Sequence, residues 1–177
     1  MEITVLDEEL AFSDLPRFRD LREINKHGLG RHFRTLVSVL RPEEQAEPEA
    51  IRVERIGLRL VEIPILEHRW SEEPFELLFD VLADPKALPV LVHGAYGERP
   101  GILALTCFAA THGLSSDELV TAAGTLGLEL PAAAFSFLEK HHRPHAGHRP
   151  LNRTADGHIK FPQVRVPPWK LRTLHAP

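Results

Sequence analysis

Two kinds of apolar pattern alternate along this chain: short apolar runs and longer segments with helical spacing. Short apolar runs typical of strands occur at about 35–40, 59–63 and 90–92. The run at 90–92 is continuous, as in a strand that is covered on both faces. Longer segments with helical spacing lie at about 74–83, 101–112, 116–126 and 131–141. This alternation predicts an α/β domain: a central, mostly parallel sheet of about four to five strands, flanked by helices.

The ends of the chain are less regular. Over residues 12–24 the apolar side chains recur every three positions, which permits a helix there. Residues 51–56 have the composition of a short helix that Gly57 would end. From residue 143 the chain is rich in proline, histidine and arginine. We therefore predict a single domain over residues 1–142 and a C-terminal arm or tail over 143–177, whose apolar residues dock on the domain: Val164, Val166, Trp169 and Leu171.

The segment 89–101 joins a buried strand to a helix through a glycine-bearing loop. Such a loop gathers backbone N–H groups, and the helix N-terminus adds a partial positive charge, so this turn is typical of anion sites. The guanidinium of Arg99 has the planar fork that suits phosphate. In the alternative interpretation the turn is only structural, and Arg99 pairs with a nearby carboxylate. The predicted phosphate-binding residues are Gly94, Ala95, Tyr96, Gly97, Glu98 and Arg99.

This segment resembles the phosphate loop of the cysteine-dependent protein phosphatases, in particular the small dual-specificity group. That family has Val-His-Cys-x5-Arg-Thr/Ser-Gly between a strand and a helix. Here the cysteine is missing and the loop is one residue short. Aligned from the strand, Gly94 replaces the nucleophile; aligned from Arg99-Pro100-Gly101, His93 stands at the cysteine position. The single cysteine, Cys107, lies among apolar residues of the following helix, where we expect a small buried side chain.

The resemblance extends over about residues 18–142 and implies a dual-specificity-phosphatase-like fold. Residues 33–44 resemble the first central strand of the family and the acidic residue after it, and 59–65 resemble a strand that ends in Ile-Pro-Ile. The resemblance also allows a short edge strand near 21–24. In relatives the loop after the Ile-Pro-Ile strand carries an aspartate that protonates the leaving group. The corresponding loop here has no aspartate, so the candidate acids are Glu67 and His68, with ordinary loop residues as the alternative.

Composition and charge narrow the classes of function. The chain of 177 residues is 43% hydrophobic, which suffices for one domain with a core. It has no apolar run that could span a membrane and no signal-peptide pattern, so we expect a cytoplasmic protein without a membrane partner. A single cysteine excludes an internal disulfide. The net charge of −4 gives no general attraction to nucleic acid, and only the basic tail favours that partner.

No cofactor or metal is expected. Four histidines lie close together at the start of the tail, but their spacing matches no strong ligand pattern and no cysteine or carboxylate completes a site. They are His141, His142, His145 and His148.

The sequence therefore predicts a catalytically inactive phosphatase-like domain that binds phosphate, or a phosphorylated small molecule or protein, at the 93–99 loop. The alternative is a weak phosphoric monoester hydrolase. In that interpretation His93 or an activated water attacks the phosphorus, Arg99 stabilises the transition state, and Glu67 or His68 is the general acid.

Overall fold

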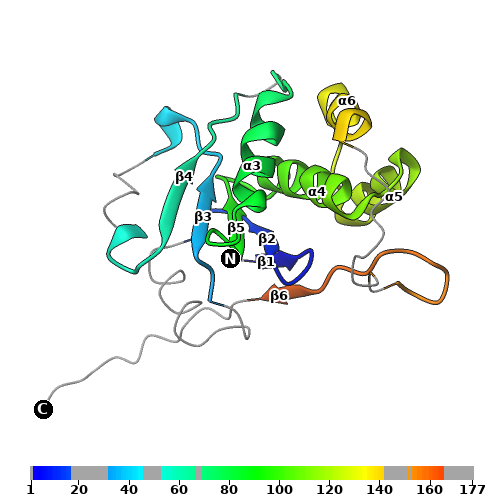
Figure 1. Ribbon diagram of the computed structural model, residues 1–177, viewed down its shortest axis with the longest axis horizontal. Helices are drawn as coiled ribbons and strands as arrows, with labels where there is room; N and C mark the ends of the chain where they lie inside the picture. The colour runs from blue at the N-terminus through cyan, green and yellow to red at the C-terminus, as the bar shows by residue number, and fades with distance from the viewer. Residues whose placement is uncertain are drawn as a thin grey trace, which may run out of the picture.

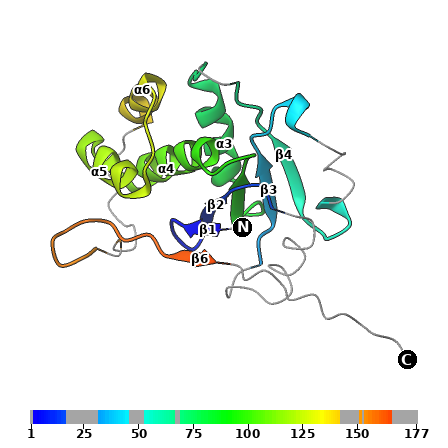
Figure 2. The same cartoon turned by 180° about the vertical axis from the view of Figure 1, so that it is seen from behind.

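The computed structural model describes residues 2–16, 32–45, 53–66, 69–141, 151 and 153–165. Their strands form one mixed sheet in the spatial order β4-β3-β5-β2-β1-β6. The strands are β1 (Glu2–Val5), β2 (Leu10–Ser13), β3 (Thr35–Ser38), β4 (Arg59–Glu62), β5 (Val90–His93) and β6 (Gln163–Arg165). The helices are α3 (Glu73–Ala83), α4 (Glu98–His112), α5 (Ser116–Leu126), α6 (Ala132–His141) and the short 3₁₀ helix η1 (Pro42–Glu44). The four α-helices lie together on one side of the sheet (Figures 1 and 2).

Four neighbouring strands, β4, β3, β5 and β2, run parallel to one another, and their carboxyl ends meet at one edge. Ser38 of β3 and Ser13 of β2 both pair with His93 at the end of β5. β1 and β6 add two antiparallel strands beyond β2. The predicted α/β class with a mostly parallel sheet is confirmed, and the sheet in the described residues has six strands rather than about four to five.

Three of the six strands, β1, β2 and β6, lie outside the predicted strand ranges and come from the ends of the chain. The segment 12–24, where the apolar spacing permitted a helix, begins inside the inner strand β2, and all four residues of β2 are buried. The edge strand allowed near 21–24 lies outside the described residues. At the other end, Val164 of β6 pairs with Ile3 of β1. The other predicted docking residues of the arm are outside the described residues, and the boundary at residue 142 stays a prediction.

Helix α4 is the centre of the helical layer. Every residue from Pro100 to Ala110 is buried, because the sheet covers one side of the helix and α3, α5 and α6 cover the others (Figure 1). The residue that follows the helix, Gly113, has a φ of 64° and ends it. Ser115 then caps α5 through a capping box with Glu118. This packing fixes the N-terminus of α4 directly behind the carboxyl end of β5.

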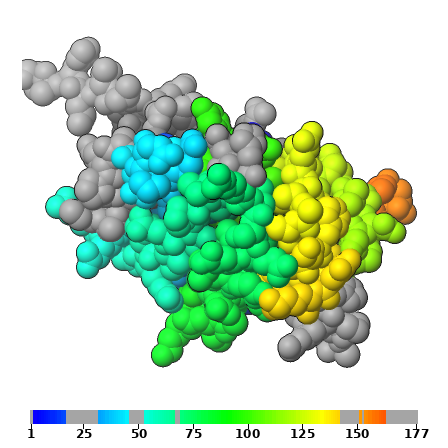
Figure 3. Space-filling model, turned by 90° about the horizontal axis from the view of Figure 1, so that it is seen from above, coloured from blue at the N-terminus to red at the C-terminus, as the bar shows by residue number. Residues whose placement is uncertain are grey.

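The 3₁₀ helix η1 follows β3 at the same edge of the sheet. It lies at the surface beside the chain that leads from β4 to α3 (Figure 3), and none of its three residues is buried. No helix in the described part of the chain is long and apolar enough to cross a membrane.

The aromatic contacts of Phe75 stabilise the helical layer beside this edge. Its ring is fully buried and packs on Trp70 and Phe137, with centroid distances of 5.4 Å to each. We expect Phe75→Ala to lower the free energy of unfolding by about 3–5 kcal/mol, because it leaves a cavity between three elements. In the matched control Leu77→Ala, on the same helix but 44% exposed, the loss should stay below about 1 kcal/mol. Equal losses in urea unfolding would contradict this account of the core.

Candidate functional site

The predicted phosphate loop lies at the carboxyl edge of the parallel strands, where ligands of open α/β sheets bind. β5 ends at His93, four residues form the turn, and α4 begins at Glu98. Gly97 is already in the helical region, with φ −70° and ψ −14°, and its carbonyl accepts a hydrogen bond from the N–H of Gly101 at 2.9 Å. Arg99 therefore lies in the first turn of α4, and its backbone direction is fixed by a helix that is buried behind it.

Gly94 has no room for a side chain. A Cβ atom built there lies 2.9 Å from Cγ2 of Val39 and 3.0 Å from Cδ of Pro100. Both neighbours are held in place, since Val39 is fully buried after β3 and Pro100 is buried in the first turn of α4. The strand-based alignment puts the family's nucleophile at this position. The backbone here has closed around the glycine, so the position does not hold a nucleophilic side chain.

His93 stands at the nucleophile position in the other alignment. It is the last residue of β5, and its side chain has no exposed surface. It lies in register between Ser13 of β2 and Ser38 of β3, both also buried. The imidazole therefore belongs to the interior of the sheet edge and has no surface at which it could meet a substrate.

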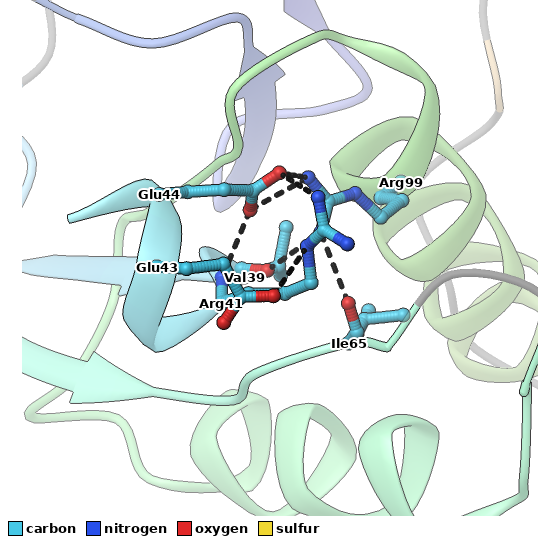
Figure 4. A network of polar contacts seen from close by, with 6 residues as sticks. All are labelled: Val39, Arg41, Glu43, Glu44, Ile65 and Arg99. Atoms are coloured by element: carbon cyan, nitrogen blue, oxygen red, sulfur yellow. Dashed lines mark hydrogen bonds and ion pairs between the residues drawn. The ribbon is translucent and has the colours of Figure 1, made fainter.

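Arg99 contacts two segments that are distant from it in sequence, residues 39–44 after β3 and Ile65 after β4 (Figure 4). Its Nη2 donates to both carboxylate oxygens of Glu44, at 2.6 and 2.8 Å. Its Nη1 donates to the carbonyl of Ile65 at 2.9 Å and, less closely, to that of Val39 at 3.5 Å. The two charged side chains are nearly enclosed, with exposures of 11% for Arg99 and 14% for Glu44. The arginine thus pairs with a nearby carboxylate, as in the structural alternative, and that carboxylate is Glu44.

Glu44 also contacts a second arginine. Its Oε1 accepts from Nη2 of Arg41 at 3.0 Å, and its Oε2 accepts from the backbone N–H of Arg41 at 2.9 Å, which closes the capping box of η1. Burial by itself would raise the pKa of Glu44. The hydrogen bonds from Arg99 and Arg41 outweigh it and hold the pKa at about 2, against an ordinary value of 4.5. Glu44 is therefore a carboxylate between two guanidinium groups at any neutral pH.

Glu44 and Arg41 were not among the candidate site residues predicted from sequence. A signal for them was present, because the resemblance included an acidic residue after the first central strand. That strand is the parallel neighbour of β5 in the sheet, so its end lies beside the predicted loop. Glu98, one of the predicted phosphate-binding residues, is exposed on the first turn of α4.

The other residues singled out from the sequence differ in their exposure. Ala95 is half-buried and Tyr96 is 77% exposed at the tip of the turn. Glu67 and His68 lie outside the described residues, so their role as candidate acids stays a prediction. Cys107 is buried, as expected, and its Sγ donates to the carbonyl of Phe75 at 3.4 Å. Burial raises the pKa of this thiol well above its usual value, so it stays protonated.

The described residues contain no group of three or more histidine, cysteine or carboxylate side chains that could hold a metal ion. Of the four clustered histidines, only His141 is described. It hydrogen-bonds Glu76 at 3.0 Å and packs against Phe137.

No family model matches this chain, and no curated protein matches it. Solved structures do match. PTPMT1 in complex with PI(5)P aligns with a TM-score of 0.66 and 13% identity, over 79% of this chain and 94% of that one. The active form of Tk-PTP aligns at 0.65 and 20%, over 79% and 95%. The catalytic core of SIW14 from S. cerevisiae, a PP-IP phosphatase in complex with citrate, aligns at 0.62 and 15%, over 78% and 84%.

These neighbours are cysteine-based phosphatases of the protein tyrosine and dual-specificity type. The protein therefore has their fold, as the sequence resemblance implied.

A cysteine introduced at the position of Gly94 should not give the protein phosphatase activity. We expect Gly94→Cys to lower the free energy of unfolding by about 1–3 kcal/mol, because its Cβ must displace Val39 or Pro100. The matched control is Gly97→Ala in the same turn, where a Cβ meets nothing within 4 Å; its stability should stay within about 0.5 kcal/mol of wild type. A Gly94→Cys variant of wild-type stability that hydrolyses an aryl phosphate would contradict this description of the loop.

The ion pairs of Glu44 should make the free energy of unfolding depend on pH in the acid range. Because the pKa of Glu44 is about 2 in the folded chain and 4.5 otherwise, its contribution is complete above about pH 4.5 and is lost as the pH falls toward 2. In Glu44→Gln this contribution is absent at every pH. The difference in the free energy of unfolding between wild type and Glu44→Gln should therefore shrink by about 2 kcal/mol between pH 5 and pH 2.5. A difference that stays constant would show that Glu44 has an ordinary pKa.

Proposed function

We propose that this protein is a catalytically inactive member of the phosphatase-like fold, whose loop binds a phosphorylated ligand without hydrolysing it. The observation that carries the loss of catalysis is the closed position at Gly94, where Val39 and Pro100 leave no space for a side chain. A thiolate mechanism needs a cysteine of low pKa at the centre of the loop N–H groups. The single cysteine, Cys107, is instead buried in α4 with a raised pKa.

The histidine route is also disfavoured by the surroundings of His93. A phosphohistidine intermediate requires an imidazole nitrogen in line with the phosphorus, and therefore a ring that reaches the substrate. The ring of His93 is completely enclosed at the end of β5. Arg99, the group that would stabilise charge on the transferred phosphoryl, is already paired with Glu44.

The position of the turn between β5 and α4 supports binding of phosphate, in addition to the residues that the turn contains. Residues 94–97 precede a helix of 15 residues at the carboxyl edge of four parallel strands, where the helix N-terminus favours an anion. PTPMT1 was solved with PI(5)P and SIW14 is a PP-IP phosphatase, so we propose a phosphorylated small molecule as the ligand class. The predicted binding residues are still 94–99, and Arg99 is their charged contact once the phosphate takes the place of the Glu44 carboxylate.

Turnover separates this proposal from a weak hydrolase. We expect wild type, His93→Ala and Arg99→Ala to release p-nitrophenol from p-nitrophenyl phosphate at no more than the buffer rate, because no described group is placed to attack phosphorus. Each variant is first checked for a cooperative melt, since Arg99→Ala removes the contacts that join three segments. Wild-type turnover that disappears in both variants would make the protein a phosphatase with His93 as nucleophile.

A further inference from the structure

Two arginines converge on one carboxylate at the candidate site. Arg99 contacts both oxygens of Glu44 and Arg41 contacts one of them, all at 2.6–3.0 Å. A guanidinium pair around two oxygens is also the arrangement that binds a phosphate monoester, since each arginine can direct parallel N–H groups at adjacent oxygens. We propose that Arg41 and Arg99 form an anion site whose resident anion is the Glu44 carboxylate, and that a phosphate monoester binds by displacing it. This inference rests on the proposed phosphate-binding function.

The charges at the site require an anion in this position. Arg99 is 11% exposed, and removing the partner of a nearly enclosed charge is strongly destabilising. Glu43 does not replace Glu44, because it is exposed and its only described ion pair is at 3.5 Å to Nε of Arg41. The site therefore alternates between two anions, the internal carboxylate and the dianionic phosphate of a ligand.

The proposed exchange moves the side chain of Glu44 and leaves the two arginines in place. Arg99 belongs to a helix whose residues 100–110 are all buried. Glu44 ends a 3₁₀ helix of three residues that buries none of them and lies at the surface (Figure 3). Rotation of the Glu44 side chain toward solvent breaks its contacts with Arg99 and with Arg41, and leaves the hydrophobic core intact. Because the pKa of Glu44 is about 2, a competing anion rather than protonation opens the site near neutral pH.

The test is phosphate binding by Glu44→Gln, which removes the internal anion and keeps the shape of the side chain. We measure the affinity for inorganic phosphate and phenyl phosphate by isothermal titration calorimetry at constant ionic strength. Glu44→Gln should bind at least about tenfold more tightly than wild type, since a competing charge-assisted contact is gone. The matched control Glu43→Gln, one residue away and 63% exposed, should stay within about twofold of wild type.

Double variants test whether the increase in phosphate affinity of Glu44→Gln depends on the two arginines. Glu44→Gln/Arg99→Ala and Glu44→Gln/Arg41→Ala should both lose the gain. An affinity that does not rise in Glu44→Gln, or that persists in either double variant, overturns the two-arginine site. Hydrolysis of phenyl phosphate by Glu44→Gln would instead overturn the proposed lack of catalysis and leave the anion site standing. Absence of binding in every variant rejects the site and the phosphate-binding function together, while the lack of catalysis is unaffected.

A second variant covers the case in which Glu44→Gln does not fold. Glu44→Asp keeps the charge on a side chain that is one methylene shorter, so its contact with Arg99 is weaker. Phosphate should raise the melting temperature of Glu44→Asp by more than that of wild type, relative to chloride at the same ionic strength. Equal rises in the two proteins would overturn the inference.

Discussion

The guanidinium of Arg99 is the group in which the three segments around the candidate site meet. It leaves the first turn of α4 and hydrogen-bonds the chain after β3, the helix η1 and the chain after β4. Residues Pro100 to Ala110 of α4 are buried. The position of Arg99 is therefore set by the packing of α4, and its hydrogen-bond partners lie around that position. A cation so enclosed needs a paired anion, and in this structure Glu44 of η1 supplies that anion beside the predicted phosphate loop.

This constraint links features that look independent in the sequence. The turn after β5 brings Pro100 and Val39 against Gly94, so that this position has no space for a side chain. The described hydrogen bonds of Arg99 are directed at the protein itself. The sheet and helices have the fold of the cysteine-based phosphatases. Function depends on the site that a fold carries, and not on the fold alone.

The parts of this structure that the sequence predicted are those in which periodicity and packing agree. The helices 116–126 and 132–141 match the predicted ranges within a residue, because their apolar stripes and caps are local signals. β2 was not predicted, since four buried residues in a short inner strand have no alternation that would distinguish them from a helical turn.

The pairing of Arg99 with Glu44 joins residues 55 positions apart. It follows from the order β4-β3-β5 in the sheet, which no local pattern contains. The crowding around Gly94 could not be predicted from the sequence either. A glycine in a loop suggests conformational freedom, whereas this glycine is required by the close approach of two neighbouring segments.

The most direct measurement of the central ion pair is a ¹³C NMR titration of the Glu44 side-chain carboxyl, assigned by comparison with Glu44→Gln. If Arg99 and Arg41 hold this carboxylate between them, its chemical shift should stay constant from pH 7 down to below about 4 and titrate with a pKa near 2. A midpoint near the ordinary value of 4.5 would mean that the arginines do not hold the carboxylate of Glu44 between them, and would contradict this account.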